Sequence, residues 1–446
     1  MSELQRETTE LLQTLVRFNT VNPPGQERAA IEYLDAYLKA AGFETEQLAA
    51  DPERPNLIAT LAGEGMGRGN GKRDPDADGP VLAYSGHVDT VLADPRDWQR
   101  DPWGAEIVDG YLWGRGSIDM KSQVAAEAVG PVSLARAGWR PARGALKLIF
   151  AADEETGGEL GARWLAEQHP DKVRCDLLLD EGAGATFEYG GRRHYGVCCG
   201  EKGIFRFKLT ALGVAGHASL PHTGDNALLK LVPVLERLAA RQPDYDLTDA
   251  PRALLATLGL DAADPGAAVA AITAANPALT VLLEPLLGVT LTPTMIHASD
   301  KMNVIPARAE LKVDCRVPPG LNEEVALRRL KEVLGDAADG IEIEFTEKVL
   351  GYQSPIESPL MDAINRWVAA NDPDATTAPV LMAAYSDSSW FRRAFPDLVA
   401  YGFFPHRHQP LLETFPMMHS DDERIDVRDL GYAAGFYADL ARDLLG

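Results

Sequence analysis

Cysteines, positive charges and long apolar runs are all in short supply in this sequence of 446 residues. Four cysteines are too few for a disulfide framework and suit a reducing compartment. Lys and Arg number 43 against 66 Asp and Glu, and the resulting formal charge of -23 repels phosphate backbones and anionic lipids. No apolar run reaches the roughly 20 residues of a membrane-spanning helix. We therefore expect a cytoplasmic protein without nucleic-acid or membrane partners.

The remaining composition is that of an ordinary globular protein, with 46% hydrophobic and 24% charged residues. At this length two domains are expected rather than one core. The first segment of the chain is polar and amphipathic and lacks the apolar centre of a secretion signal. The adjacent Cys198 and Cys199 lie in a strand-like run, where buried packing is favoured over a vicinal disulfide or a thiolate metal site.

Apolar strands alternate with helices over the first part of the chain. Continuous apolar runs predict buried strands at Val81–Tyr84, Ala145–Ala151 and Cys175–Leu179, with helical segments between them. This alternation predicts an α/β fold with a mostly parallel sheet covered by helices on both faces. Sites in such sheets form at the carboxyl ends of the strands, and a histidine or acidic cluster follows each of the three runs.

The pattern changes near residue 200. A strand–helix–strand–strand–helix–strand order follows, which resembles a ferredoxin-like split unit. We therefore predict a catalytic domain made of residues 1–198 and 351–446, interrupted by an inserted domain over 199–350. Within the insert, the Ala- and Leu-rich stretch 251–287 is predicted to be helical. The Gly- and Asp-rich stretch 63–80 is predicted to be a surface loop.

Five short clusters carry candidate chemistry: His87-Val88-Asp89, Asp119 in a glycine-rich turn, Asp153-Glu154-Glu155, Asp180-Glu181 and His419. Several of them, taken alone, have an ordinary explanation as a helix cap or a solvated acidic turn. A neutral imidazole is a good zinc ligand, and a nearby carboxylate can steer its ring. Of two adjacent carboxylates, one can bind a metal while the other acts as a general base.

Together the clusters supply two histidines and several carboxylates, a set that suits two divalent ions. Two ions a few ångströms apart can share one bridging carboxylate and one bridging water. Their combined charge lowers the pKa of that water towards neutrality. The pattern therefore predicts a hydrolytic centre with two metal ions.

Seven longer motifs follow one another along the chain: SGHVDT, WGRGSIDMK, DEETGG, LLDEGAG, GVAGHASLP, NVIPARAELKVDCR and MHSDDER. In this order they resemble the co-catalytic zinc metallopeptidases and amidohydrolases. That family includes aminoacylase, glutamate carboxypeptidase, acetylornithine deacetylase, succinyl-diaminopimelate desuccinylase and carnosinase-type dipeptidases. The resemblance covers nearly the whole chain. It implies a zinc-exopeptidase-like catalytic domain with an inserted ferredoxin-like domain for dimerisation and as a lid.

The resemblance also implies a role for each residue of the metal site. The metal ligands would be His87, Asp119, Glu155, Glu181 and His419. Asp119 would bridge the two ions, Glu154 would be the general base, and Asp89 would steer the His87 ring. Asp180 remains an alternative to Glu181 as the ligand. The ions are expected to be zinc, with cobalt and manganese as alternatives.

Four further positions match residues of the family that contact substrate. His217 matches a histidine that reaches across a dimer interface and donates a hydrogen bond to the developing oxyanion, so a homodimer is expected. Asn303 and Arg316 match residues that hold the substrate, and Arg316 can pair with its carboxylate in bidentate fashion. Gly402 matches a loop glycine that lets backbone N–H groups approach the same carboxylate.

The expected function is hydrolysis of an amide bond beside a free carboxylate, in N-acyl amino acids or small peptides. A strict dipeptidase or carboxypeptidase is the alternative within this class. A non-catalytic metal-binding member of the fold is a second alternative, disfavoured because every matched position holds a competent residue. His406 and His408, in a Pro-flanked loop, are interpreted as surface residues rather than pocket residues. The stretch 251–290 departs from the shortest family members, which leaves substrate size open.

Overall fold

The structure, a computed structural model, describes residues 1–63 and 79–446, so most of the loop predicted over 63–80 lies outside the described residues. The chain divides into two compact units. The first unit comprises Met1–Cys199, Ser354–Val380 and Ser386–Gly446, and the second comprises Gly200–Gln353 and Leu381–Tyr385. Among the described helices, none is both long and apolar enough to cross a membrane.

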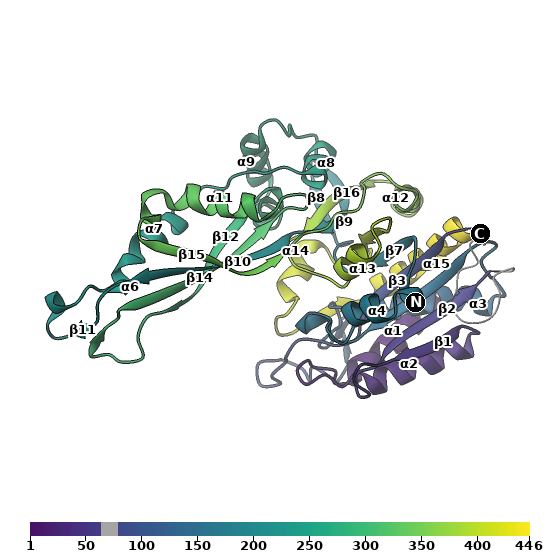
Figure 1. Ribbon diagram of the computed structural model, residues 1–446. Coiled ribbons are helices and arrows are strands. Elements are labelled where there is room, and N and C mark those ends of the chain that lie inside the picture. The colour runs from purple at the N-terminus through teal and green to yellow at the C-terminus, as the bar shows by residue number, and fades with distance from the viewer. Residues whose placement is uncertain (64–78) are drawn as a thin grey trace. The chain divides into compact units, whose positions relative to one another are not determined.

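A mixed sheet forms the centre of the first unit (Figure 1), and its strands lie in the order β1-β2-β6-β3-β7-β17-β9-β16, with β8 beside β9. The central strands β6, β3, β7 and β17 are parallel, as predicted. The outer pairs β1–β2, β2–β6 and β17–β9 are antiparallel. The strands of this unit are β1 (Glu44–Leu48), β2 (Asn56–Ala62), β3 (Val81–His87), β4 (Ile107–Val108), β5 (Tyr111–Trp113), β6 (Ala145–Ala151), β7 (Leu177–Asp180), β8 (Thr186–Tyr189), β9 (Arg192–Glu201), β16 (Ala375–Met382), β17 (Val399–Gly402) and β18 (Arg424–Asp426).

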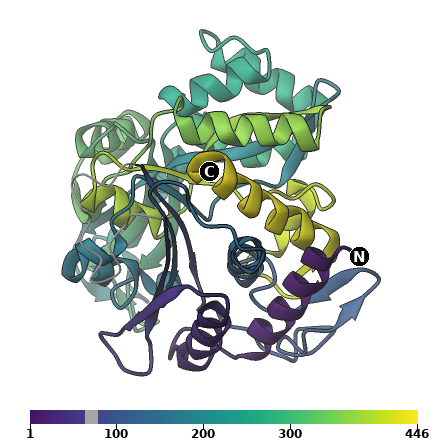
Figure 2. The same ribbon diagram turned by 90° about the vertical axis from the view of Figure 1, so that its right-hand side faces the viewer.

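Helices cover both faces of this sheet, because its central strands are apolar on both sides. Tyr84 of β3 stacks edge-on against Tyr437 of α15 on one face, whereas the next residue back, Ala83, packs with α4 and α13 on the other. The helices of this unit are α1 (Glu3–Arg17), α2 (Arg28–Ala40), α3 (Lys121–Arg136), α4 (Ala162–Gln168), α5 (Pro170–Val173), α12 (Pro359–Asn371), α13 (Ser388–Ala394), α14 (Leu411–Thr414) and α15 (Val427–Leu445). Figure 2 shows α15 (yellow) running alongside α1 (purple).

Helix α3 is buried along almost its whole length because small residues allow its neighbours to approach closely. A Cβ at Gly130 would crowd the carbonyl oxygen of Ala434 in α15. At its first turn, the buried Lys121 donates its ammonium to the carbonyl oxygens of Leu15 and Phe18 (3.0 and 2.8 Å). These carbonyls belong to the C-terminal end of α1, which a lysine stabilises. The start of α3 is therefore held firmly in place.

The second unit contains a four-stranded antiparallel sheet in the order β12-β14-β10-β15, with helices on one face. The chain order strand–helix–strand–strand–helix–strand is that of a ferredoxin-like unit, as predicted. Its elements are β10 (Gly203–Leu212), β11 (Gly216–His217), α6 (Ala227–Lys230), α7 (Val232–Ala239), α8 (Asp249–Thr257), α9 (Pro265–Ala275), α10 (Pro277–Leu283), β12 (Thr290–His297), β13 (Val304–Ile305), β14 (Arg308–Val317), α11 (Glu323–Leu334) and β15 (Ile341–Val349).

The helical stretch predicted over 251–287 is interrupted, and its breaks have local causes. Gly259 adopts a left-handed φ of 71° just past α8, which is a common way for a helix to end. Asp264 and Asn276 then cap α9 and α10, each followed by a proline at the first helical position. The stretch is therefore three short α-helices followed by a 3-10 helix at Glu284–Leu287, rather than one helix.

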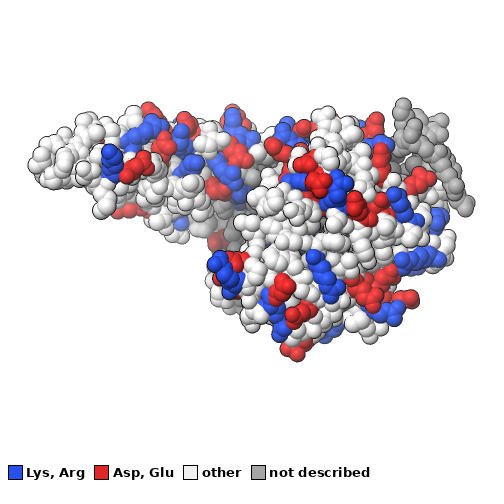
Figure 3. All heavy atoms as spheres, turned by 90° about the horizontal axis from the view of Figure 1, so that it is seen from below, with Lys and Arg blue, Asp and Glu red and all other residues white. Residues whose placement is uncertain are grey.

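Charges of both signs are interspersed on the surface in spite of the net charge of -23. On the face in Figure 3, Lys and Arg side chains lie among Asp and Glu side chains. On the open face of the second unit's sheet, for example, Arg206 pairs with both Asp314 and Glu347 (3.2 and 2.6 Å). On this face the acidic side chains are thus interspersed with basic ones, as expected of a solubilising surface.

Candidate metal centre

Three of the acidic and histidine clusters meet at one edge of the first unit's sheet. His87 is the last residue of β3, Glu154 and Glu155 form a short turn after β6, and Glu181 directly follows β7. Because these three strands are neighbours and parallel, their carboxyl ends lie side by side. The order of strands therefore brings together residues that are nearly 100 positions apart in the sequence.

Asp119, just before α3, lies between the two histidines. Its Oδ1 is 3.2 Å from His87 Nε2, and its Oδ2 is 3.1 Å from His419 Nε2. The two oxygens of one carboxylate thus face two different imidazoles. This is the arrangement that a carboxylate bridging two cations requires.

A glutamate accompanies each histidine. Glu181 Oε2 and Glu154 Oε2 both lie 3.9 Å from His87 Nε2, and Glu155 Oε2 lies 3.4 Å from His419 Nε2. The ligand atoms of His87, Asp119 and Glu155 also lie within 4.8 Å of one another, as do those of His87, Glu154 and Glu181. The geometry brings all six side chains into one cluster, and it is Glu181 of the Asp180–Glu181 pair that faces His87.

The donor set fits divalent cations in both chemistry and charge. It combines two imidazoles with the carboxylates of Asp119, Glu155 and Glu181, the ligand types that zinc and similar ions take. Glu155 Oε1 is buried and has no hydrogen-bond partner among the described residues. An orphaned, buried carboxylate oxygen costs free energy unless a cation compensates it.

The pKa shifts of these groups show that the carboxylates of the cluster lack sufficient positive charge around them. Burial raises the pKa of Glu154 and of Glu181 well above the ordinary glutamate value, and neighbouring carboxylates add to the effect. Burial opposes protonation of His87, but hydrogen bonds with Asp119 and Asp89 outweigh it and hold its pKa well above the usual range. Hydrogen bonds to Asp119 and Glu155 raise the pKa of His419 to about 10. Cations in the cluster would relieve this imbalance.

Asp89 contacts His87 and also holds the turn that follows β6. The Nδ1 atom of His87 is 3.0 Å from the backbone oxygen of Asp89 and 3.5 Å from its carboxylate. The same buried carboxylate accepts the backbone N–H groups of Glu154 and Glu155, each at 3.2 Å. Asp89 is therefore placed both to fix the His87 ring and to fix the backbone of the two glutamates.

Three buried residues that sequence reasoning missed support this turn: Asn22, Glu27 and Arg54. The Asn22 amide donates to Asp89 (2.8 Å) and to Asp153 (3.1 Å), which precedes Glu154. Arg54 donates to Asp153 (2.9 Å) and is itself paired with Glu27. Asn22 stands in the Asn-Pro-Pro-Gly segment that separates α1 from α2, so the sequence signalled only a turn there.

Gly402, the last residue of β17, lies in the same unit beside Glu181. A Cβ at this position would overlap the carbonyl oxygen of Glu181. Gly402 pairs with Asp180 on one side and with Cys198 on the other. The backbone of Glu181 approaches so closely that only glycine fits at position 402. Gly402 is therefore needed for the placement of Glu181, apart from its predicted role in substrate binding.

In the Pro-flanked loop after β17, one of the two histidines interpreted as surface residues is buried. His406 is 4% exposed, so its interpretation as a surface residue is wrong, whereas His408 is exposed. The loop runs beside Ala185, and the His406 ring packs edge-on against Phe404. Cys198 and Cys199 are both buried, as predicted for packed strand residues.

The other matched residues lie in the second unit. His217 is exposed in β11 and its Nδ1 is 2.7 Å from Ser219 Oγ, and the backbone of Asn303 accepts a hydrogen bond from Ala218 (3.1 Å). Arg316, near the end of β14, is held by Asp314, with 2.8 Å between its Nε and Oδ1. His217 and Asn303 are thus neighbours, whereas Arg316 lies at the other end of the sheet.

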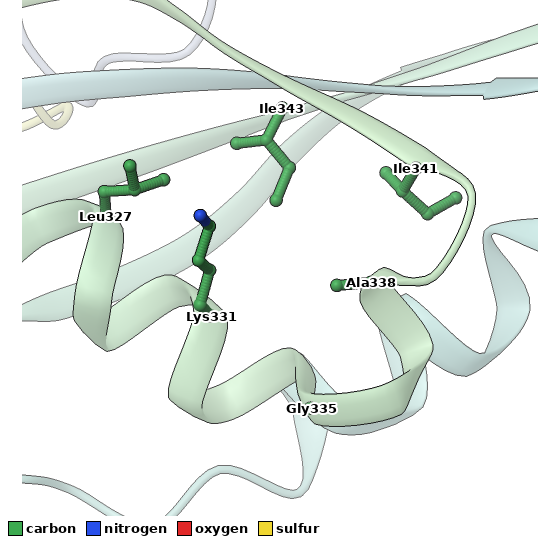
Figure 4. A pocket seen from close by; sticks show the side chains of 6 residues that line it. All are labelled: Leu327, Lys331, Gly335, Ala338, Ile341 and Ile343. Carbon is green, nitrogen blue, oxygen red and sulfur yellow. The ribbon is translucent and has the colours of Figure 1, made fainter.

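A hollow in the second unit, between α11 and β15, contains none of these residues. Figure 4 shows that aliphatic side chains and one amine line it; the residues are Leu327, Lys331, Gly335, Ala338, Ile341 and Ile343. It offers no cluster of groups for metal binding or proton transfer.

The chain is similar to known proteins over most of its length. Residues 83–443 match the model of the family described as Peptidase family M20/M25/M40. The chain is 27% identical over 441 residues to a succinyl-diaminopimelate desuccinylase of Cereibacter sphaeroides, with 96% of each chain covered. The family match spans most of the chain and every residue of the cluster.

Solved structures share the fold. One is the M20 family metallo-carboxypeptidase Sso-CP2 from Sulfolobus solfataricus, with a TM-score of 0.69, 18% identity, and 100% of this chain and 99% of that chain covered. Another is a dinuclear metal-binding peptidase of the M20 family from Bacillus subtilis, with a TM-score of 0.61, 14% identity, and 99% and 98% covered. At these identities the likeness shows the fold alone.

Proposed function

The chain belongs to peptidase family M20/M25/M40 and is a hydrolase, and from that premise we propose that it uses two divalent ions to cleave the amide bond beside a free carboxylate. The observation that carries the proposal is the Asp119 carboxylate, whose two oxygens face His87 and His419. We propose His87 and Glu181 as further ligands of one ion and His419 and Glu155 as further ligands of the other. Zinc suits these donors best, with cobalt and manganese as alternatives.

The ions would polarise the scissile carbonyl and lower the pKa of a water molecule. We assign the role of general base to Glu154, because the proposed ligand sets are complete without it. Its Oε2 lies 3.9 Å from His87 Nε2, close to the proposed ions. Its Oε atom accepts the proton of the attacking water and passes it to the nitrogen of the leaving amine. Asp89 holds the backbone of Glu154, so the base keeps its position during both transfers.

The proposed substrates are N-acyl amino acids or small peptides with a free carboxylate. The name of the desuccinylase relative describes removal of an acyl group from an amino acid, and the name of the first structural neighbour describes a carboxypeptidase. Both reactions cut an amide beside a carboxylate. We propose that Arg316 and the backbone around Gly402 hold that carboxylate, since a guanidinium pairs with it in bidentate fashion. Asn303, a neighbour of His217, would contact the substrate from a second copy of the chain.

We further propose a homodimer in which His217 of the partner subunit stabilises the oxyanion. Ile204 pairs with Arg316 at one end of β10, and Leu212 pairs with Arg308 at the other end. Eight residues of strand separate these ends by roughly 27 Å. His217 lies beyond Leu212, so His217 and Arg316 of one chain are too far apart to contact one small substrate.

Exposed apolar side chains support association through the second unit. Leu229 on α6 and Met295 and Ile296 on β12 are at least half exposed. Strand β12 is an edge strand, so its backbone can pair with a second copy. We place the protein in the cytoplasm, which the free thiols of Cys175, Cys199 and Cys315 support.

A substrate panel on the metal-loaded protein tests the proposal. N-acetyl and N-succinyl amino acids and dipeptides are each compared with the same compound carrying a carboxamide in place of the carboxylate. Hydrolysis of the free acids that stops on removal of metal and returns on its addition is the expected result. Equal rates on acids and carboxamides, or hydrolysis that survives complete metal removal, would refute it.

A further inference from the structure

Glu423 is buried, carries no metal-binding role in the proposal, and receives four hydrogen bonds. Its Oε1 accepts the backbone N–H groups of Ile118 and Asp119 (2.6 and 3.0 Å). Its Oε2 accepts the backbone N–H of Gly116 (3.1 Å) and the guanidinium of Arg115 (2.6 Å). All four donors belong to the turn that carries Asp119.

The turn has this shape because of its glycines. Gly114 and Gly116 have φ values of 154° and 84°, conformations that favour glycine. The turn points three N–H groups at one place, where a buried carboxylate satisfies them. Without that acceptor these donors would be unsatisfied in the interior.

Glu423 also belongs to the segment that carries His419, four residues earlier. Arg115 donates to the carbonyl of Ser420 (2.9 Å) as well as to Glu423. The backbone N–H of Gly114 donates to the carbonyl of Glu423 (2.9 Å), and pairing of β18 with β5 continues the contact. His419 itself has a φ of 58°, an unfavourable conformation for a residue with a side chain, so its surroundings must hold it there.

We propose that Glu423 is a positioning residue that joins the Asp119 turn to the His419 segment and thereby sets the affinity of the centre for the ion between them. The proposal rests on the metal centre proposed above. Glu423 touches neither ion nor substrate in this scheme. It acts by fixing the separation of Asp119 Oδ2 and His419 Nε2, which is 3.1 Å.

The chain offers a matched control in Asp429. This carboxylate is also fully buried and accepts three backbone N–H groups, from Arg407, His408 and Gln409, each at 2.9 Å. The loop it holds carries none of the proposed metal ligands. Asp429→Asn therefore removes the same kind of contact without touching the metal site.

The test measures zinc stoichiometry and affinity by competition with a chromophoric chelator, and the absorption spectrum of the cobalt-loaded protein. Glu423→Gln should weaken binding of one ion by about 10- to 100-fold and change the cobalt spectrum, as loss of a group that orients ligands does. Asp429→Asn should leave both measurements as in the unmodified protein. Activity of Glu423→Gln should recover as the metal concentration rises.

Two ions bound with unchanged affinity by folded Glu423→Gln would overturn the inference. If that variant does not fold, Glu423→Asp keeps the charge but is too short for all four donors, and the same loss of affinity is expected of it. Unchanged affinity in Glu423→Asp would then overturn the inference. Failure of the unmodified protein to bind metal would refute the proposed function instead, so the two failures are distinguishable.

Discussion

The metal cluster of the first unit and the substrate-binding residues proposed in the second differ in how firmly the chain holds them. His87 and Asp119 are buried, and the exposed His419 is held by contacts with Asp119 and Glu155. His217 is exposed, and its ring contacts only its neighbour Ser219 among the interactions of the described residues. Arg316 is partly exposed, with Asp314 as its ion-pair partner.

Under the proposal, one folded chain would fix the metal centre, whereas the oxyanion donor His217 would depend on association. Changes in the first unit should therefore affect chemistry within each chain. Changes at His217 should act across subunits, and changes at Arg316 should affect binding more than turnover. Four experiments, ordered by expected effect, test this division.

Glu154→Gln should give the largest loss, about 10²- to 10⁴-fold in kcat, because the amide cannot accept the proton of the attacking water. Metal content should stay at two ions per chain, since the scheme gives Glu154 no ligand role. Steady-state kinetics and metal analysis of the same sample check both statements. Near-normal turnover would show that the base is another residue.

His217→Ala should lower kcat by about 10²- to 10³-fold, the usual effect of losing one oxyanion donor. Mixing this variant with Glu154→Gln, under conditions in which subunits exchange, tests whether His217 acts on the metal centre of the other subunit. A mixed dimer has one site with both residues intact, so random pairing restores about a quarter of the normal activity. No recovery after verified exchange would mean that His217 acts within its own chain or not at all.

Arg316→Lys should raise KM by roughly 10-fold with little change in kcat, because an ammonium cannot make the paired contact with a carboxylate. Arg308→Lys is the control. Arg308 lies on the same strand and also pairs with a nearby acid, Glu310, at 2.8 Å. An equal effect of both substitutions would assign the loss to the strand rather than to substrate binding.

The smallest expected effect is on the pH dependence of stability. The experiment compares the buried His406 of the first unit with the exposed His297 of the second. Burial lowers the pKa of His406 to about 4. Since the unfolded chain takes up this proton near pH 6.5 and the folded one does not, stability falls as the pH drops from about 6.5 towards 4. Acidification from pH 7 to pH 5 should lower the free energy of unfolding by about 2 kcal/mol through this residue.

Urea unfolding of His406→Phe at both pH values checks the sign and size of this effect. The variant should lose less stability on acidification than the unmodified protein. His297→Gln, which changes an exposed side chain of β12, should keep the full dependence. A His406→Phe variant with the same pH dependence as the original chain would contradict the assignment.

Part of the centre could be predicted from sequence because three of its clusters stand at the ends of apolar strands, whereas Asp119 and His419 do not. The run Ala145–Ala151 has the same bounds in sequence and structure, and the parallel order of β3, β6 and β7 brings their carboxyl ends together. The residues at those ends carry recognisable chemistry. The pattern of residue types therefore indicates the clusters, whereas the resemblance to the family implies which residue of each cluster binds metal.

The buried residues that hold the cluster in place could not be predicted, because their contacts join distant positions and no nearby sequence motif marks them. Glu423 accepts N–H groups of residues about 305 positions earlier, and backbone donors look alike at every position. Arg54 reaches Asp153 across 99 positions for the same reason. The need for glycine at position 402 depends on a strand neighbour, Glu181, that sequence alone does not place.

The packing of α15 against α1 and α3 has a consequence for synthesis of the protein. At a rate of roughly 5–20 residues per second, the ribosome would take on the order of 10–50 seconds to make the chain between Cys199 and Val427. During that time both the sheet strand β17 and the helix α15 are missing, so we expect the apolar strands β3, β6 and β7 to stay open to solvent. Protease digestion of stalled nascent chains, with and without residues 427–445, would show whether this surface stays open.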